Sequence, residues 1–456
     1  MSENRRKKTV RNKSKLSPTQ IIAITFAAII LLGTLLLTLP IASRSGQSVG
    51  FRPALFTATS ATCVTGLIMG DTWSMWSGFG QIVIITLIEI GGLGFMSMAS
   101  LVIFVLRKKI GLKQRMVMAQ ALSVNEMESV VRLQKWVLLG SLIIQLTGAA
   151  ILFLRFLPQY GWKQAAVWGV FHAISAFCNA GFDILGKVAP GASMMYFNHD
   201  PVVLITLMAL IVIGGLGFFV WEEVATVRCI KRFSVYTKLV LVTSFVLILG
   251  GAVLFGLLEW NNPKTLGQMD TPQKILNAFF QSVTVRTAGF AAVDQGSLTE
   301  SGKALSVVLM LIGGSSGSTA GGLKTVTVLV LVLFVLTRAR GRNTVTVFRR
   351  TVPHEKIMDA ATIVSLVVGL AMAGAIFITA TSPVGFADAL FETASALATV
   401  GLTAGVTPLL SIPAQLMIIV FMYFGRVGIL TISLGFLMGD KAEDRFRYAD
   451  TNLLIG

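Results

Sequence analysis

A short segment that occurs four times constrains this chain more than any other feature. Its copies align over thirteen residues without gaps, as LFTATSATCVTGL (55–67), VFHAISAFCNAGF (170–182), AFFQSVTVRTAGF (278–290) and LFETASALATVGL (390–402). The second position is Phe in every copy, and the twelfth is Gly: Gly66, Gly181, Gly289 and Gly401. Self-similarity at a nearly fixed period indicates that the chain folds as four related units.

Longer apolar stretches flank every copy. About 20 apolar residues cross a bilayer as a helix, and eight stretches qualify: 18–40, 76–106, 131–157, 201–227, 237–259, 302–337, 357–381 and 411–437. Hydrophobic residues make up 54% of the 456 residues and charged residues only 13%, which is too few to cover a soluble protein. The repeated segments, near 51–61, 166–177, 274–283 and 386–397, are too short to span, so we expect re-entrant helices.

The sequence therefore predicts an all-α polytopic membrane protein with four helix–pore-loop–helix repeats around a pseudo-fourfold pore. The expected divisions are a basic tail (1–17), repeat 1 (18–110), repeat 2 (111–232), repeat 3 with an interrupted inner helix (233–345), repeat 4 (346–440) and a C-terminal tail (441–456). No cleavable signal peptide is expected, because the first apolar run is too long and lacks a cleavage site.

The positive charges predict the orientation. The net charge is +17, but the basic residues form short clusters between apolar stretches, which indicates membrane topology rather than nucleic-acid binding. Clusters occur in 5–15, 107–115, 228–232, 338–350 and 441–447. We expect these ends in the cytoplasm with both termini, and the four short segments open to the outside. The basic tail either lies on anionic membrane lipid or only sets the topology.

Four copies with one orientation imply an axis along the membrane normal. Inverted repeats, which are common in secondary transporters, would put alternate basic clusters on the wrong side. Four glycine loops around such an axis predict a cation filter, in which backbone carbonyls replace the hydration shell of the ion. One glycine alone usually marks only a turn, whereas four equivalent glycines favour a filter. The expected ion-binding residues are Thr62, Cys63, Val64, Thr65, Gly66, Cys178, Asn179, Ala180, Gly181, Val285, Arg286, Thr287, Ala288, Gly289, Ala398, Thr399, Val400 and Gly401.

Several of these positions and their neighbours have alternative interpretations. We expect the Arg286 side chain to point away from the ion, since a cation on the axis would repel it. Asp71, Asp183 and Asp294 follow the filter segments and either concentrate cations or cap helices. His172 is expected to pack within its pore helix, and the cysteines Cys63 and Cys178 to be small buried side chains.

A second glycine motif follows each filter segment, as IGGLGF (90–95), IGGLGF (213–218), IGGSSG (312–317) and FGRVGI (424–429). Small residues let membrane helices approach closely, so we assign these glycines to packing. In the third repeat the motif begins a run of glycine and small polar residues, which would strongly weaken a helix there. This stretch is interpreted as a gate, with a glycine-rich kink as the alternative: Gly313, Gly314, Ser315, Ser316, Gly317, Ser318, Thr319, Ala320, Gly321 and Gly322, followed by Lys324.

Two charged residues lie inside apolar stretches at a similar depth. Arg426 is a functional candidate because charges within membrane spans are costly. We expect it to face the pore or the gate as an electrostatic barrier, and we consider a pair with Glu89 as a hypothesis.

The four loops together resemble the Trk/Ktr/HKT superfamily of potassium transporters, and most closely the bacterial KtrB membrane subunit. The resemblance covers the chain from about residue 18 and rests on TCVTGL (62–67), FCNAGF (177–182), TVRTAGF (284–290), ATVGLT (398–403), IGGSSGSTAGGLK (312–324) and FGRVG (424–428). It implies K⁺ uptake across the cell membrane, often Na⁺-dependent, and a gating role for residues 313–322.

The resemblance also implies partners. These are a second copy in a homodimer and a cytosolic, KtrA-like ring of RCK-domain subunits that bind ATP or ADP. No nucleotide site is expected in this chain. No Ser/His/Asp set, HExxH motif or pair of intramembrane carboxylates suggests an enzyme. A secondary transporter of another cation or small solute remains the alternative function.

Overall fold

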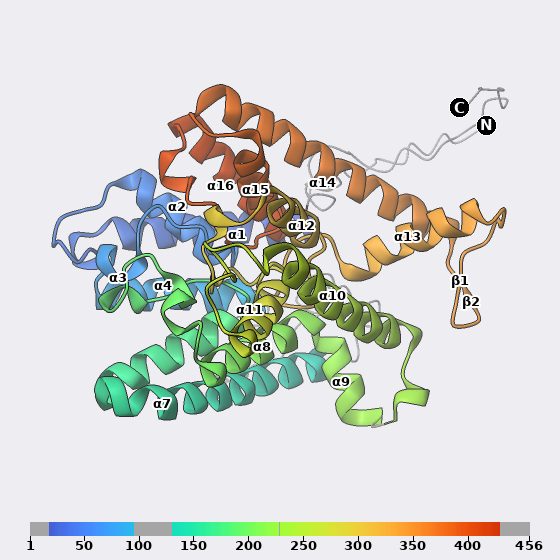
Figure 1. Ribbon diagram of the computed structural model, residues 1–456, viewed down its shortest axis with the longest axis horizontal. Coiled ribbons are helices and arrows are strands. Elements are labelled where there is room, and N and C mark those ends of the chain that lie inside the picture. Colours follow the sequence, from blue (N-terminus) through green and yellow to red (C-terminus); the bar gives the residue numbers. More distant parts are fainter. Residues whose placement is uncertain (1–17, 95–129, 228, 429–456) are drawn as a thin grey trace, which may run out of the picture.

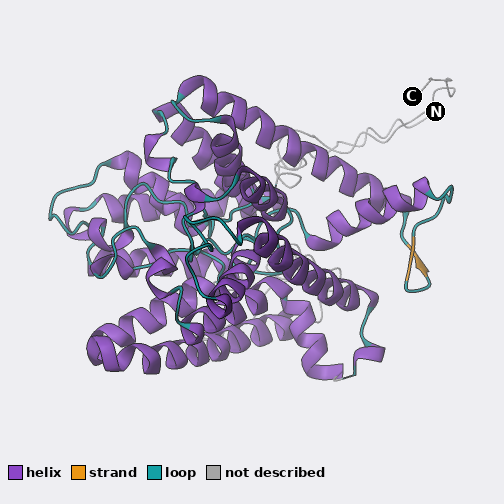
Figure 2. Ribbon diagram, in the orientation of Figure 1, coloured by secondary structure: helices purple, strands orange, loops and turns teal. Residues whose placement is uncertain are grey.

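The computed structural model describes residues 18–94, 130–227 and 229–428, and the chain there is mainly helical (Figures 1 and 2). The basic clusters 5–15, 107–115 and 441–447 lie outside these residues. The first two repeats contribute α1 (Pro18–Thr38), α2 (Phe51–Thr62), α3 (Thr72–Met75), α4 (Gly78–Leu93), α7 (Val130–Phe177), α8 (Pro201–Leu216) and α9 (Phe218–Val227). The last two contribute α10 (Val235–Glu259), α11 (Thr271–Thr284), α12 (Glu300–Leu311), α13 (Thr325–Ala339), α14 (His354–Thr381), α15 (Phe386–Leu397) and α16 (Ile412–Val427).

Shorter elements connect these helices. The only strands in the described part form a small antiparallel hairpin, β1 (Thr346–Val347) with β2 (Arg350–Thr351). Single 3₁₀ turns lie in the connections: η1 (Pro40–Ala42), η2 (Leu185–Lys187), η3 (Ser193–Phe197), η4 (Ile230–Arg232), η5 (Gln295–Ser297) and η6 (Thr407–Leu409).

The first helix of each repeat is long and apolar enough to cross a membrane. These spans are Gln20–Thr38, the first part of Gln134–Phe177, Val235–Glu259 and His354–Thr381. In α7 the backbone leaves the helical region at Gly161, where φ is 73°. Gly169 lies against the backbone of Ala149 and Phe153, so the segment after Gly161 folds back on the segment before it. The second half of α7 is therefore the short re-entrant helix of repeat 2, as α2, α11 and α15 are in the other repeats.

The second long helix of each repeat ends at the second glycine motif. Gly94, Gly217 and Gly428 follow α4, α8 and α16 with φ of 83°, 97° and 95°. Such values suit glycine, which has no Cβ to clash. The chain bends by 94° between α8 and α9, so the apolar stretch predicted over 201–227 is broken at Gly217. The expected continuations over 95–106 and 429–437 lie outside the described residues.

The earlier glycines of these motifs bring helices close together, as predicted. A Cβ on Gly91 would collide with the carbonyl oxygen of Thr62, which ends the re-entrant helix of the same repeat. The equivalent pairs in repeats 2 and 4 are Gly214 with Phe177 and Gly425 with Leu397. The motifs thus seat each second helix directly on the end of its re-entrant helix.

The four repeats form a closed ring. In every repeat but the last, the second helix packs on a helix of the following repeat: α4 on α7, α8 on α11 and α12 on α15. The last repeat closes the ring, because α16 packs on α2 and also touches α1. Such a closed circuit is what parallel repeats around one axis require.

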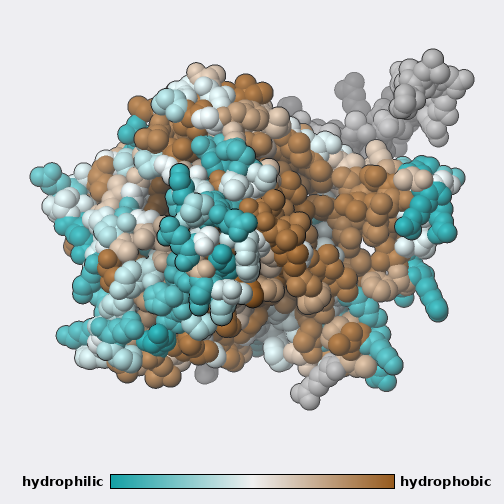
Figure 3. Space-filling view, viewed as in Figure 1, coloured by the Kyte–Doolittle hydropathy of each residue, from teal (hydrophilic) through white to brown (hydrophobic). Residues whose placement is uncertain are grey.

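The surface is divided along the same axis. Figure 3 shows hydrophobic residues gathered over α10, α13 and α14, with hydrophilic residues at the left and at the far right. The connections that hold Lys231, Arg232 and the basic residues of 338–350 lie together at the right of Figure 1, near α9 and the β1–β2 hairpin. The loop after α1 and the helix α3 lie at the opposite end. The protein is thus a multi-pass membrane protein, and the basic connections after α9 and α13 lie at one end of it.

Candidate functional site

The four repeated glycines meet at the centre of the ring. A Cβ added to Gly66 would collide with the carbonyl oxygen of Ala180, and one on Gly289 with that of Val400. The other two glycines show the same relation, since Gly181 faces Ala288 and Gly401 faces Thr65. Each loop therefore touches the next through backbone atoms, and the fourth touches the first. No side chain larger than hydrogen fits at any of the four positions without moving a neighbouring loop.

The loop backbone alternates in handedness. Each glycine has a positive φ (97°, 69°, 83° and 92° in chain order). The residue two positions before each glycine also has a positive φ, although it carries a side chain: Val64 (57°), Asn179 (60°), Thr287 (68°) and Thr399 (50°). This conformation is costly for residues with a Cβ and persists only where the surroundings enforce it. Alternating handedness lets successive carbonyl groups point to one side of the chain.

Hydroxyl groups of the re-entrant helices hold the loops in two different ways. Ser60 and Ser395 occupy the same repeat position, and their Oγ atoms accept hydrogen bonds from the N–H of Gly66 and Gly401, each at 3.0 Å. Ser175, at that position in repeat 2, instead donates to the carbonyl of Phe182 at 2.7 Å. The loops are thus fixed by short-range bonds within their own repeats.

The third repeat is shorter by one residue between the buried phenylalanine of its re-entrant helix and its glycine. Here Thr284, one position later than the serines, donates to the carbonyl of Phe290 at 2.6 Å. The buried phenylalanine is Phe280, whereas Phe279 is only half-buried. The gap-free alignment, which matched Phe279 to Phe56, Phe171 and Phe391, was therefore wrong for this repeat. A closed ring tolerates this change because the shorter segment lies on the helix side of the loop.

The predicted filter residues are brought together as expected. All eighteen lie in the four loops or at the ends of the helices that lead into them, and all are buried. The re-entrant helices end at Thr62, Phe177, Thr284 and Leu397, so their negative ends face the loops. The hydroxyls of Thr62, Thr65 and Thr399 have no hydrogen-bond partner among the described residues.

The irregular segment between α12 and α13 crosses beneath this ring. Thr319 Oγ1 donates to the carbonyl of Phe177 at 3.0 Å, at the end of the second re-entrant helix. A Cβ on Gly321 would collide with the hydroxyl of Thr399 in the fourth loop. Tyr236 OH donates to the carbonyl of Ser316 at 3.0 Å. The segment thus extends from repeat 2 to repeat 4 directly below the loops.

Two half-buried cations hold this segment by its carbonyl groups. Arg426 donates to the carbonyl of Thr319 at 2.5 Å and to those of Gly91 and Gly92 in repeat 1. Lys324 donates to the carbonyls of Ala320 at 2.9 Å and Gly321 at 3.4 Å. Charge-assisted hydrogen bonds of this kind are stronger than neutral ones. Positive charge is therefore concentrated immediately below the ring.

The hypothesis that Glu89 pairs with Arg426 was wrong. The Glu89 carboxylate accepts hydrogen bonds from Gln145 Nε2, at 3.2 and 3.0 Å, and from Cys178 Sγ at 3.3 Å. Arg426 instead donates hydrogen bonds to the backbone carbonyls of the glycine motif that follows Glu89. Cys178, like Cys63, is a buried free cysteine, as expected.

The outer sides of the loops are braced by polar residues on the re-entrant helices. Buried Glu392 accepts hydrogen bonds from Thr403 Oγ1, Thr407 Oγ1 and Ala404 N–H. Gln281 and Gln295 form a reciprocal amide pair at 2.7 and 3.0 Å. Sequence reasoning missed these residues. A polar residue at the third repeat position, as in Glu392 and His172, was the available signal.

The histidine and the aspartates near the loops have local hydrogen-bond partners. His172 is buried, and its Nδ1 lies 2.7 Å from the carbonyl oxygen of Trp168, which confirms the packed role. Asp71 caps α3 through the N–H of Ser74, and Asp294 caps η5 through the N–H of Gly296. Asp183 accepts from the N–H of Leu185 at 3.2 Å. The capping interpretation therefore holds for Asp71 and Asp294.

Comparison with known proteins gives a consistent result. The family described as TrkH, cation transport protein, matches residues 3–445. The chain is 40% identical to the potassium/sodium uptake protein NtpJ of Enterococcus hirae, covering 98% of this chain and 99% of that protein. It is also 40% identical to the Ktr system potassium uptake protein B of Bacillus subtilis, covering 97% of each. The crystal structure of the potassium transporter TrkH from Vibrio parahaemolyticus superposes with a TM-score of 0.71 at 18% identity, covering 94% of this chain and 86% of that one.

Proposed function

Because the chain belongs to the TrkH family of cation transport proteins, which are ion transporters rather than enzymes, we propose that it takes up K⁺ through the column between its four glycine loops. One observation carries this proposal above all others. Each loop glycine has a positive φ and no room for a Cβ, and each lies against a carbonyl of the next loop. Relatives named as potassium uptake proteins support the choice of ion.

The selectivity filter in this proposal consists of the loop residues 62–66, 178–181, 285–289 and 398–401. Their carbonyl oxygens replace water around the ion, and the helix ends behind them add negative potential. The interlocked backbones support selectivity, because neighbouring loops are already in contact and therefore oppose contraction around a smaller ion.

The gate in this proposal is the segment 313–322 with Lys324 and Arg426. Its position below the loops and the positive charge that holds it there would both oppose a cation that leaves the filter. Uptake then requires the segment to move aside, which means that the bonds of Arg426 and Lys324 to its carbonyls break or rearrange.

The resemblance to Ktr-type membrane subunits supports a proposal for the wider assembly. We propose a homodimer in the cell membrane with both termini in the cytoplasm and Na⁺-dependent uptake. A cytosolic RCK-domain ring with bound ATP or ADP would act on the gate. The basic end that holds η4 and the β1–β2 hairpin is the side on which such a ring would dock. The basic tail 1–17 would lie near anionic lipid or set the topology.

Growth and uptake in a bacterium that lacks its own K⁺ transporters test the filter. The wild type is expected to restore growth at low K⁺ and to take up ⁸⁶Rb⁺. Gly66→Ser and Gly401→Ser are each expected to lower the preference for K⁺ over Na⁺ about tenfold or more, since a Cβ displaces the next loop. Gly369→Ala is the matched control, because no atom lies within 4 Å of a Cβ at that helical glycine. Unchanged ion preference in both serine variants would refute the proposed filter.

Deletion of residues 315–321 tests the gate in the same cells. The shortened chain is expected to take up ⁸⁶Rb⁺ faster than the wild type, because the segment no longer crosses below the loops. Uptake at the wild-type rate, with normal amounts of protein in the membrane, would argue against a gate.

A further inference from the structure

The guanidinium group of Arg286 is buried without a partner. The residue is 9% exposed, and it forms no hydrogen bond or ion pair with any residue that the structure describes. Its Nε is fully enclosed and unsatisfied. A guanidinium carries five N–H donors and stays charged, and a buried charge without compensation is strongly destabilising. This group therefore calls for an acceptor that the polypeptide does not supply.

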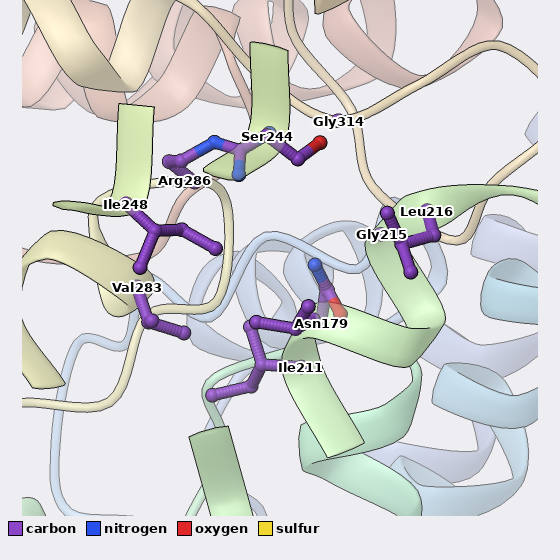
Figure 4. A pocket seen from close by; sticks show the side chains of 10 residues that line it. Asn179, Ile211, Gly215, Leu216, Ser244, Ile248, Val283, Arg286 and Gly314 are labelled. Atoms are coloured by element: carbon purple, nitrogen blue, oxygen red, sulfur yellow. The ribbon is translucent and has the colours of Figure 1, made fainter. Parts of the chain in front are cut away.

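A small cavity lies beside this group. It has a volume of about 20 Å³ and is bounded by Arg286, Ser244, Asn179, Gly314 and apolar side chains that include Ile211 and Ile248. Figure 4 shows Arg286 and Ser244 close together on one side of the cavity, with Asn179 opposite them. Ser244 is buried and lines the same cavity. The unsatisfied Nε donor of Arg286 and the Ser244 residue thus share one cavity.

The size and charge of the cavity define what fits. A volume of about 20 Å³ accepts a particle of one heavy atom, such as a water molecule or a monatomic ion. Water would accept hydrogen bonds but would leave the charge of Arg286 unbalanced. No aspartate or glutamate lines the cavity. We propose that this cavity binds a single halide ion, which is chloride under cellular conditions, between Arg286 and the Ser244 hydroxyl.

The location of the cavity gives this ion a role. Arg286 precedes Gly289 in the third loop, Asn179 belongs to the second loop, and Gly314 belongs to the segment below them. An unbalanced positive charge here would oppose cations in the ring, since charges act over long distances where water is excluded. A bound halide cancels that charge. It therefore lets the third loop contain an arginine without weakening cation binding.

Anomalous X-ray scattering tests the binding directly. Crystals of the full chain grown in bromide are expected to show a bromide peak between Arg286 and Ser244. The peak should disappear in Arg286→Gln. It should weaken in Ser244→Ala, a second variant that keeps the arginine and therefore still tests the site if Arg286→Gln does not fold. Arg155→Gln is the control, because Arg155 already pairs with Asp200 at 2.7 Å and should leave the peak unchanged. Absence of the peak in the wild type, or a water molecule in its place, would overturn the proposal.

Ion exchange in vesicles tests the role. Purified wild type in vesicles with equal K⁺ on both sides is expected to exchange ⁸⁶Rb⁺ about tenfold more slowly when gluconate replaces chloride, and to recover in bromide. Arg286→Gln should be insensitive to the anion. This readout rests on the proposed K⁺ transport, whereas the bromide peak does not, so the two ideas can fail separately. A bromide peak without any anion effect on exchange would support the site and overturn the screening role.

Discussion

The glycine loops and the segment 313–322 are both irregular and largely buried near the same axis, yet they are held in different ways. Each loop is fixed by its own repeat, as Ser60 fixes Gly66 and Ser395 fixes Gly401. The segment below is also held by other repeats, through Arg426 of α16 and Phe177 of α7. Tyr236 of α10 and Lys324 hold it from its own repeat.

This difference separates the part that must keep its shape from the part that must move. Loops tied to their own helices, and locked to one another by backbone contacts, cannot shift individually. A segment held partly by hydrogen bonds to other repeats can leave when those repeats move, because hydrogen bonds exchange readily for water while interlocked backbones do not. The contrast predicts that changes in the ring alter ion preference, whereas changes around the segment alter rate.

The largest effect is expected from a change in the ring itself. Gly289→Ala places a Cβ against the Val400 carbonyl and on a backbone with φ of 83°. We expect ⁸⁶Rb⁺ uptake to fall about 100-fold, since each factor of ten corresponds to about 1.4 kcal/mol. Uptake assays with Gly369→Ala as the matched control check this. Wild-type uptake in Gly289→Ala would show that the ring is not locked.

A smaller effect of opposite sign is expected from Arg426→Gln. The substitution removes the charge and most of the bonds to Thr319, Gly91 and Gly92, so the segment is released more often. We expect ⁸⁶Rb⁺ exchange by the purified chain to rise about tenfold with K⁺ preference unchanged.

The control for this variant is Lys356→Gln, whose side chain is exposed and pairs with Asp359. Melting temperature and elution volume show whether each variant is folded. A folded Arg426→Gln variant with altered ion preference and an unchanged exchange rate would contradict the prediction that the ring sets preference and the segment sets rate.

The smallest effect concerns the outer rim of the ring. Burial raises the pKa of Asp183 to about 6, the nearby Asp71 carboxylate adds to this shift, and the N–H of Leu185 opposes it. The carboxylate is therefore charged at pH 7.5 and neutral well below pH 6. We expect acidification of the outside to slow uptake about twofold without changing ion preference, because only the attraction of cations is lost. Asp183→Asn should remove this pH dependence of uptake. A preference for K⁺ over Na⁺ that changes with pH would contradict the prediction.

Much of the architecture could be predicted because it depends on residues with distinctive physical requirements. Four glycines at equivalent positions, each after a short amphipathic segment, indicated loops that converge, and the structure brings Gly66, Gly181, Gly289 and Gly401 into contact. The interrupted third inner helix followed from its glycines and hydroxyl residues. The capping roles of Asp71 and Asp294 were foreseen only as one of two possibilities.

The features that escaped prediction depend on tertiary contacts without a side-chain signature. The motif IGGLGF is the same at 90–95 and 213–218, but the bend at Gly217 is stabilised by the Phe218 N–H, which donates to the Gly317 carbonyl at 2.8 Å. Arg426 was considered as a partner of Glu89, but it binds backbone carbonyls, which every residue has. The shorter third repeat was hidden because two adjacent phenylalanines, Phe279 and Phe280, both fit the aligned position.

The packing of α16 on α2 has a consequence for biosynthesis. The helix that closes the circle is the last of the described helices to leave the ribosome, and its partner is among the first. A chain released before α16 is made therefore has an open side and no complete conduit.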